Sequence, residues 1–406
     1  MKIYNKIKGL AIAAAGLLFV LASCNKVPED PTAIPQAAPA GTSTIATILN
    51  DPNYSIFKAA VTKAGLLPTL SATNLRFTLF LPDDAAMTAS GITAAAVAAL
   101  PVTTITPLVS YHIIPQTVTS ASIPTYFPNF QYPTIYNPAP TLSSLLRLTT
   151  FPSRRGSNFW VNNIPLTAVD ILASNGVIHK VPLVVAPPSQ YLWDRISVDP
   201  DMTYLKAAII RADSGVASTS PSSLIGALNN IGANFTVFAP TNLAFQQTLT
   251  FQITQALVAQ GVPLSFAQAQ AAAFASTPNV FSNALLYSSL TATVVKGIIV
   301  YHIFDNGEKL PVGSRILRPG RAFTVNFPTT PTAYPTLLNS AVAVHPGVTL
   351  QATFGATGVT AATVKGLANA TPANILINPT PAPSGTSDQH YLNGVIHKID
   401  QVLIPQ

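Results

Sequence analysis

Histidine is the residue type in this sequence whose number and spacing could most readily support metal or catalytic chemistry. Five of the six histidines are candidates, namely His112, His179, His302, His390 and His397. None has a second histidine two or four residues away, which is the spacing of zinc ligands carried by a single strand or helix. We therefore predict no metal site. We expect the repeated histidines to be half-buried, with ring nitrogens that bond backbone groups and fix neighbouring strands.

Nucleophilic catalysis has equally little support in the sequence. The chain has one cysteine, Cys24, and its serines do not occur in the G-x-S-x-G turn that carries a hydrolase nucleophile. A carboxylate pair for glycoside hydrolysis needs no local motif, so the 14 Asp and Glu residues leave that alternative open. We assign no catalytic residue and no cofactor, and an enzyme is the third class of function that we consider.

Two nearly identical segments must position two of these histidines, His179 and His397. NGVIHKVP at Asn175–Pro182 returns as NGVIHKID at Asn393–Asp400. Because side chains alternate along a strand, Val395, His397 and Ile399 are expected to share one face. The Asn-Gly pair that opens each copy suits a tight turn, since both residues tolerate positive φ. An apolar run and a proline follow each copy, so both are predicted to be closing strands, one in each of two domains.

The low content of charged residues limits the class of protein. They make up 9% of the sequence, against roughly 25% in typical soluble proteins. The surface must therefore consist largely of Thr, Ser, Asn, Gln, Pro and Ala, as in many secreted and envelope proteins. Nucleic-acid binding needs clustered Lys and Arg, so this composition argues against a nucleic-acid partner.

The N-terminal segment has the pattern of a secretory signal. Three lysines precede the apolar run 9–22, which is shorter than the rough 20-residue requirement for spanning a bilayer, and small residues stand before Cys24. We predict that residues 1–23 are removed. The proline-containing residues 24–40 predict an extended tether. One cysteine cannot form an internal disulfide, so the domains must be stable through packing alone.

Each half of the remaining chain opens with the same series of predicted helices. Apolar residues at helical spacing predict two short helices within 44–70, which are separated at Asp51-Pro52 and ended by Gly65. The same order of helix, break and helix returns within 192–209. A strand halted by proline comes next in each half, and a polar pair able to cap a helix follows it.

These strands and the closing strands carry a family resemblance. NFTVFAPTNLAF closely resembles the first signature of the fasciclin (FAS1) domain, and NGVIHKIDQVLIP closely resembles its second. The family's intervening Tyr-His signature occurs twice, and the first copy departs from the family pattern at Asp83-Asp84 and Met87. The structural signature positions implied by the resemblance are Phe77, Phe80, Pro82, Asn175, Gly176 and His179 in the first copy, and Phe235, Phe238, Pro240, Asn393, Gly394 and His397 in the second.

The resemblance implies a mixed α+β fold of two tandem modules, each a wedge-like β-sandwich flanked by short helices. We place the first module at residues 41–188 and the second at residues 189–406. In each, the closing strand and the strand that follows the first helices should lie in the core. The family's usual role, adhesion or matrix binding outside the cell, is the corresponding expectation for function.

The setting of Cys24 resembles the bacterial lipobox, in which the cysteine after a Leu-Ala-Ser type triplet is acylated and becomes the mature N-terminus. Asn25 follows it, as in lipoproteins sent to an outer membrane. The segment 26–30 resembles the surface-export signals of Bacteroidetes lipoproteins. This resemblance implies a lipid-anchored protein of the cell envelope, in the outer membrane, and leaves open whether it faces the periplasm or the cell surface.

The second half carries two insertions, at residues 249–293 and 321–390. The alanine- and glutamine-rich Phe266–Phe274 predicts a helix in the first insertion, and the second is rich in Pro, Thr, Gly and Asn. Long polar insertions in surface connections cost little stability and often carry function.

The first half has a smaller proline-rich segment at residues 122–155, whose aromatic residues include Tyr126, Phe127, Phe130, Tyr132 and Tyr136. Its rings either pack onto the module or form an exposed surface for a glycan or a protein. Trp160 lies shortly after Arg154-Arg155 and also has two interpretations. It is either an exposed anchor for a partner or a residue of the core.

The sequence thus predicts a lipid-anchored binding protein of adhesive type, without catalysis, whose ligand is a protein or polysaccharide outside the cell. The alternative is a glycan-binding accessory lipoprotein of a polysaccharide-capture system. Because the family associates its Tyr-His region with receptor contact, the candidate binding residues are Tyr111, His112, Tyr301 and His302, together with Tyr126, Tyr132 and Tyr136 of the proline-rich segment.

Overall fold

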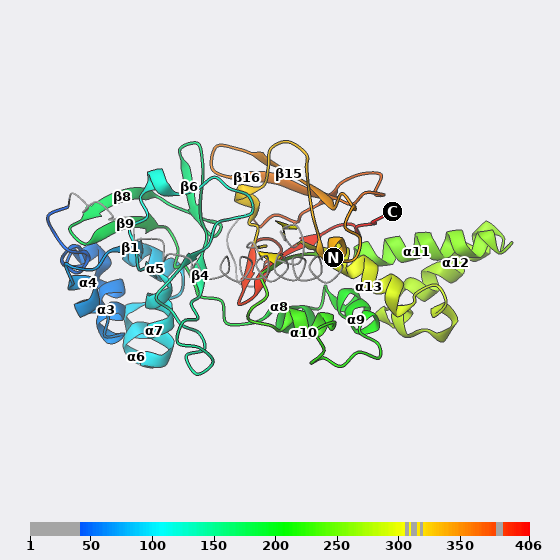
Figure 1. The fold of residues 1–406 in the computed structure, drawn as a ribbon, viewed down its shortest axis with the longest axis horizontal. Coiled ribbons are helices and arrows are strands. Elements are labelled where there is room, and N and C mark those ends of the chain that lie inside the picture. Colours follow the sequence, from blue (N-terminus) through cyan, green and yellow to red (C-terminus); the bar gives the residue numbers. More distant parts are fainter. Residues whose placement is uncertain (1–40, 305–307, 310–314, 317–319, 379–384) are drawn as a thin grey trace, which may run out of the picture. The chain divides into compact units, whose positions relative to one another are not determined.

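Two four-stranded sheets of the same topology organise the chain (Figure 1). They belong to a computed structural model that describes residues 41–304, 308–309, 315–316, 320–378 and 385–406. The predicted signal, the Cys24 lipidation site and the tether lie outside the described residues. The first sheet has the order β2 (Ile113–Ile114), β1 (Phe77–Pro82), β9 (Gly176–Val181) and β8 (Ala168–Ala173), and the second has the order β11 (Ile303–Phe304), β10 (Phe235–Pro240), β19 (Gly394–Ile399) and β18 (Gln389–Tyr391).

A parallel pair of strands forms the centre of each sheet. β1 lies beside β9 and β10 lies beside β19, in the same register, so that Phe80 is opposite His179 and Phe238 is opposite His397. Every residue of β1 and β19 is buried. Burial on both faces is usual for parallel strands. The prediction that the signature strands lie in the core of their modules is confirmed.

The turn before each closing strand differs from the sequence-based expectation. The two turn residues are Ser174-Asn175 and Leu392-Asn393, and the glycine is already the first residue of the strand. Asn175 is held by its side chain, because its Oδ1 accepts a hydrogen bond from Ile45 N at 2.9 Å, and Asn393 is held likewise by Leu192 N. The glycine is required by close approach, since a Cβ on Gly394 would stand 2.5 Å from the carbonyl oxygen of Phe235.

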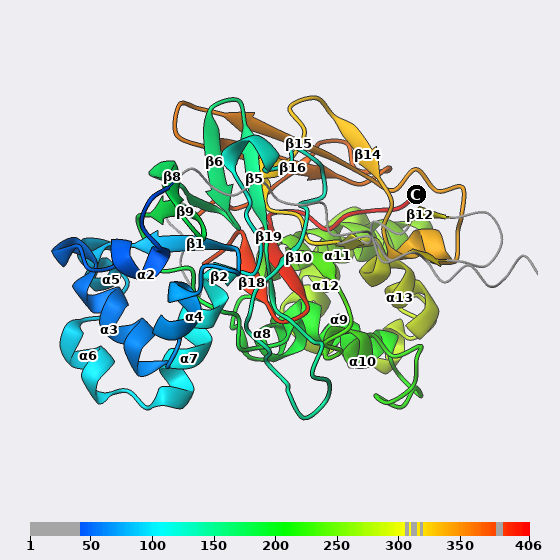
Figure 2. The ribbon, with the colours of Figure 1, turned by 60° about the vertical axis from the view of Figure 1, so that its left-hand side comes forward.

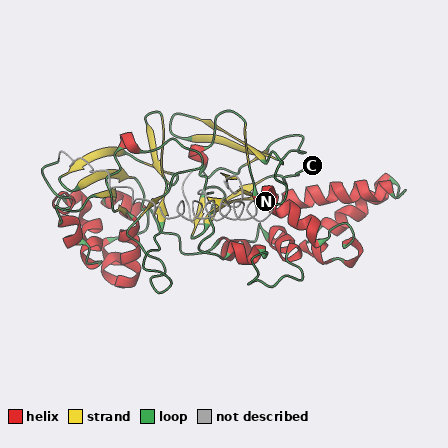
Figure 3. Cartoon of the chain, viewed as in Figure 1, coloured by secondary structure: helices red, strands yellow, loops and turns green. Residues whose placement is uncertain are grey.

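Helices cover one face of each central sheet (Figures 1 and 3). Gly65 has φ of 71° and ends the second predicted helix, and the break at Asp51-Pro52 begins a short 3-10 turn, so the predicted order of helix, break and helix is confirmed. The helices of the first module are α2 (Ile45–Ile48), α3 (Ser55–Lys63), α4 (Leu67–Ser71), α5 (Asp84–Ala89), α6 (Ala94–Ala99) and α7 (Val102–Tyr111). Those of the second are α8 (Leu192–Val198), α9 (Thr203–Ala212), α10 (Leu224–Leu228), α11 (Asn242–Ala259), α12 (Leu264–Ala275) and α13 (Ala292–Tyr301). None of the helices in the described residues combines the length and apolar composition needed to span a bilayer.

The opposite face of each central sheet is covered by additional strands (Figure 2). In the second module these strands form a separate four-stranded sheet of order β14 (Thr332–Tyr334), β15 (Val348–Phe354), β16 (Val359–Lys365) and β17 (Ala373–Asn374). The first module has β3 (Tyr132–Pro133), β4 (Thr149–Thr150), β5 (Pro152–Arg155), β6 (Asn158–Val161) and β7 (Ile164–Pro165). The short strands β12 (Glu308–Lys309) and β13 (Arg315–Ile316) pair with each other. The 3-10 helices are η1 (Pro52–Tyr54), η2 (Ser120–Ser122), η3 (Pro278–Ser282), η4 (Ala284–Leu286), η5 (Thr324–Asn326) and η6 (Leu337–Ser340).

The two insertions have different structures. The first contains α12 and most of α11, so the helix predicted at Phe266–Phe274 is confirmed. The second, interpreted only as a polar segment, contains the sheet β14 to β17. Every second residue at the start of β15 points inward. These residues, Val348, Leu350 and Ala352, pack in one cluster with Phe238 and Ile399 of the central sheet.

A shared apolar cluster joins the modules. Phe151 and Trp160 of the first module pack with Phe323, Val325 and Val395 of the second. Trp160 is therefore a buried residue of the junction, and not an exposed anchor. The mixed fold of two repeated modules is confirmed, while the wedge-like sandwich form stays a prediction.

Candidate functional site

The histidines of the two Tyr-His signatures connect backbone groups inside their modules. His302 Nδ1 donates to Ile298 O at 2.8 Å, and its Nε2 accepts from Leu403 N at 2.8 Å. His112 repeats this arrangement with Leu108 O and Val185 N. Burial lowers the pKa of each ring to about 4, so both rings are neutral at physiological pH. Each histidine thereby attaches the end of the module to the helix that precedes its Tyr-His pair.

The histidines of the closing strands use the other ring orientation. His397 Nε2 donates to Ala322 O at 2.9 Å, and its Nδ1 accepts from Asp388 N at 3.1 Å. His179 bonds Val118 O and Asp170 N in the same way. Burial lowers the pKa of both rings.

Each of these histidines has an aspartate partner that the sequence reasoning missed. Asp170 and Asp388 both adopt positive φ, at 58° and 53°, and both stand the same number of residues before their histidine. The carboxylate of Asp388 accepts from Thr324 N and Thr324 Oγ1, both at 2.7 Å. Asp170 accepts from the backbone and hydroxyl of Ser120. The equal Asp-to-His spacing in both copies was the available signal.

The tyrosines of the Tyr-His signatures are also buried. Tyr111 Oη donates to Thr149 O at 2.8 Å, and Tyr301 Oη donates to Gly347 O at 2.6 Å. Burial raises the pKa of both phenols. The four candidate binding residues of the Tyr-His signatures are thus enclosed, and they offer no surface that a partner could contact. This burial does not support their predicted binding role, and in the structure their side chains have internal bonding roles.

The proline-rich segment of the first module reaches into the second module. Phe127 packs against Phe304, Phe327 and Tyr334, with ring centroids 5.8, 5.6 and 4.6 Å away. Of the three predicted binding tyrosines, Tyr132 and Tyr136 are half-buried against the first module. Tyr126 is 70% exposed, and the neighbouring Phe130 is 47% exposed. The exposed aromatic surface expected as one alternative is therefore reduced to these two rings.

A buried polar group reinforces the junction. Arg321 Nη1 donates to His390 Nε2 at 2.7 Å and to Tyr391 O at 3.2 Å. The Nδ1 of His390 lies 3.4 Å from Tyr111 Oη of the first module. Burial lowers the pKa of Arg321 to about 10, and burial together with the Arg321 charge holds the pKa of His390 well below its ordinary value. His390 is thus a neutral bridge between the modules.

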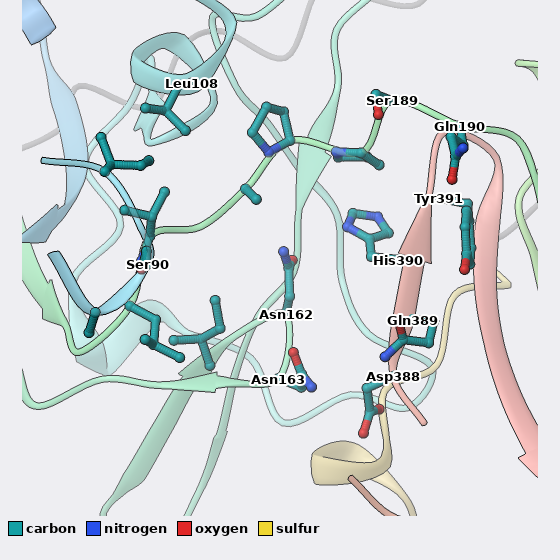
Figure 4. A pocket seen from close by; sticks show the side chains of 18 residues that line it. Ser90, Leu108, Asn162, Asn163, Ser189, Gln190, Asp388, Gln389, His390 and Tyr391 are labelled. Atoms are coloured by element: carbon teal, nitrogen blue, oxygen red, sulfur yellow. The ribbon is translucent and has the colours of Figure 1, made fainter. Parts of the chain in front are cut away.

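A pocket of about 470 Å³ opens beside this bridge (Figure 4). Ser90 and Leu108 of the first module stand across it from Tyr391 of the second, and Gln190 belongs to the segment that links the modules. The described residues contain no group of three or more His, Cys, Asp and Glu side chains that could hold a metal ion. The sequence reasoning missed this pocket, because it forms only where the modules meet.

The first insertion presents the other candidate surface. α11 and α12 pack against each other as a hairpin, which extends beyond the neighbouring helices in Figure 1. Ala267 and Ala271 face inward, whereas Phe251 is 65% exposed and Phe266 is 66% exposed. The chain has no Asp, Glu, Lys, Arg or His between Asp213 and Lys296. We call the exposed large apolar side chains of this hairpin the hairpin surface. They are Leu243, Phe251, Val258, Leu264 and Phe266.

Comparison with known proteins bears on the first module. Residues 52–187 match the fasciclin domain. One solved structure similar to this chain is a FAS1 domain pair from the insect cell adhesion molecule fasciclin I, at 15% identity, with a TM-score of 0.32, over 86% of this chain and 96% of that chain. No curated protein matches the chain. The second module repeats the central sheet of the matched module strand for strand.

Proposed function

We propose that the protein is an adhesive-type binding protein of the cell envelope, anchored through an acylated Cys24 and acting without catalysis. Fasciclin domains are associated with cell adhesion, and residues 52–187 match that domain. The ligand is a protein or a polysaccharide outside the cell. The observation that carries the proposal is the hairpin surface, because it exposes large apolar side chains on an element without any charge.

The hairpin surface has the properties of a contact surface. Leu243, Phe251 and Val258 are spaced by about two helical turns, so they lie along one side of α11. Fully burying a side chain of this size stabilises a complex by roughly 1.5–3 kcal/mol. An element without charge gains nothing from electrostatic steering, so its binding should depend little on salt.

The anchor and the contact surface can be tested separately. Changing Cys24 to Ser should move the protein from the membrane fraction to the soluble fraction, and a variant that stays in membranes through a high-salt wash would contradict lipid anchoring at this residue.

The contact surface is tested by adhesion. Beads coated with residues 24–406 should adhere to whole cells of the source organism. The double variant F251S/F266S should lose most of that adhesion at both low and high salt.

The second candidate function, a glycan-binding accessory lipoprotein of a polysaccharide-capture system, is favoured by a different observation. Tyr126 and Phe130 remain exposed on the proline-rich segment, and aromatic rings suit contact with a sugar face. The matched variant Y126A/F130A separates the two functions. If it abolishes binding to a glycan array while the hairpin variant does not, the second function is supported and the first is contradicted.

A further inference from the structure

The pocket at the junction is built from three parts of the chain. The first module supplies an apolar wall with Leu108, Leu183 and Val184, and the second supplies the segment from Asp388 to Tyr391. Residues 186–190, which include the link between the modules, close a third side. Pockets at domain interfaces with volumes of roughly 300–1,000 Å³ are common ligand sites, and this one has about 470 Å³.

The carboxylate and the imidazole that line the pocket, those of Asp388 and His390, are already engaged. Asp388 is 8% exposed, and both of its carboxylate oxygens accept hydrogen bonds from Thr324. His390 is neutral, with Nε2 bound to Arg321 and Nδ1 close to Tyr111 Oη. Neither residue offers a free charge to a ligand, so an ionic ligand would lack a counter-charge among the described lining residues.

Neutral polar groups stand free at the same site. The side chains of Asn163, Ser189 and Gln190 line the pocket and make no hydrogen bond to any described residue. Figure 4 shows Asn163 at one end of the cavity and Gln190 at the other. Amides offer both donors and acceptors. The pocket thus combines an apolar wall with neutral hydrogen-bonding groups.

We propose that this pocket binds a neutral sugar residue, either free or at the end of a glycan chain. A pyranose ring has an apolar face of C–H groups, which suits the wall formed by Leu108, Leu183 and Val184. Its hydroxyls are donors and acceptors that match the amides of Asn163 and Gln190. The site goes beyond the contact proposed for the hairpin surface, because it lies at the junction and uses other residues.

The test measures binding of neutral mono- and disaccharides to residues 24–406 by isothermal titration calorimetry, alongside a glycan array. Saturable binding of a free sugar identifies a small-molecule site, and binding on the array alone identifies the end of a glycan chain. Either result supports the site only if Ala186→Trp abolishes binding. Ala186 is an exposed residue on the rim of the pocket, so a tryptophan there fills the cavity without replacing a core side chain.

Two further variants make the test specific. Asn163→Ala should weaken binding about tenfold, since the loss of one hydrogen bond of about 1.4 kcal/mol has that effect. Ala269→Trp, on the exposed side of α12, is the matched control and should bind as the parent does. Both tryptophan variants are checked by thermal unfolding. Absence of binding to any neutral sugar in both the calorimetry and the array, unchanged binding in Ala186→Trp, or preference for a charged sugar overturns the proposal.

Failure of this proposal is distinguishable from failure of the proposed adhesive function. The hairpin variant F251S/F266S leaves the junction intact and should retain sugar binding. Ala186→Trp leaves the hairpin surface intact and should retain adhesion of coated beads to cells.

Discussion

The two pairs of signature histidines show how one residue type can have a purely internal role in this chain. All four rings join two backbone groups, and the ring nitrogen that donates differs between the Tyr-His pair and the closing-strand pair. Backbone groups that are buried without a partner are costly. Each histidine therefore supplies the hydrogen-bond partner for one buried backbone N–H and one buried backbone C=O that have no partner within the strands and helices.

Replacing His302 by Ala should destabilise the second module. It removes the partners of Ile298 O and Leu403 N, which should cost roughly 1–3 kcal/mol. Urea denaturation of the parent and the variant measures this difference. Adhesion of the folded variant should be unchanged, because the ring is 1% exposed. Unchanged stability combined with lost adhesion would show that His302 contacts the ligand.

Acid should destabilise the protein through the same residues. The pKa of His112 and His302 is about 4 in the folded state and about 6.5 in the unfolded state, so the unfolded state binds more protons between these values. The stability from the neutral rings is fully present above pH 6.5 and is lost as the pH falls towards 4. The shift corresponds to roughly 3 kcal/mol per histidine.

The free energy of unfolding, measured in urea from pH 7.5 to 4.5, checks this expectation. Below pH 6.5, the slope of the free energy of unfolding against pH reports the number of protons taken up on unfolding. This number should be smaller in His302→Ala by about one. A parent protein of constant stability between pH 6.5 and 4.5 would contradict the assignment of these rings as buried and neutral.

At the scale of elements, the glycine that begins each closing strand is as constrained as the histidine within it. Gly394→Ala should destabilise the second module by more than the roughly 1–3 kcal/mol of ordinary overpacking, because the clash is with a backbone oxygen. Gly297→Ala is the matched control. Gly297 lies within α13 and has no atom near its added Cβ, so this change should stabilise by roughly 0.5–1 kcal/mol. Equal effects of the two changes on the melting temperature would refute the close-approach argument.

Elements with strong local patterns were predictable from the sequence. Apolar spacing with Gly65 as a stop gave the first helices, and alternation in the repeated segments gave the closing strands. The sheet β14 to β17 was missed because only β15 has clear alternation, while β14 and β17 are short. Short strands are specified by their partners more than by their own residues.

The candidate sites were less predictable than the elements. The pocket combines Ser90, Gln190 and His390, which are far apart in the sequence and meet only at the junction. The candidate binding role of the Tyr-His pairs rested on family resemblance, whereas the repetition of their histidines had already indicated an internal bonding role. The exposed rings of α11 and α12 were equally hidden, because an apolar helix gives no sign of which face it leaves to solvent.

At the scale of the whole molecule, the junction is the feature that the sequence specified least. Apolar residues such as Trp160 and Phe127 have no mark that assigns them to their own module or to its neighbour. In the structure Trp160 packs in the shared cluster and Phe127 lies among rings of the second module. The described residues of both modules fall within one compact unit. The modules are thus joined by packing as well as by the short link at residues 187–190.

Separating the modules should leave two folded but weakened domains. Residues 41–188 and 189–406 each keep their own helix-side core, so each is expected to unfold cooperatively. Each should melt below the parent, because separation exposes the shared cluster and each buried ring of this size stabilises by roughly 1.5–3 kcal/mol.

Phe127→Ala provides the control. It should lower the melting temperature of the joined chain but change little in the isolated first module, where the ring has lost Phe304 and Tyr334. Differential scanning calorimetry of the parent, the two halves, and Phe127→Ala in the joined chain and in the isolated first module measures these melting temperatures. If neither half unfolds cooperatively, the two modules share a single folding unit, and an equal effect of Phe127→Ala in both contexts would show that this ring does not join them.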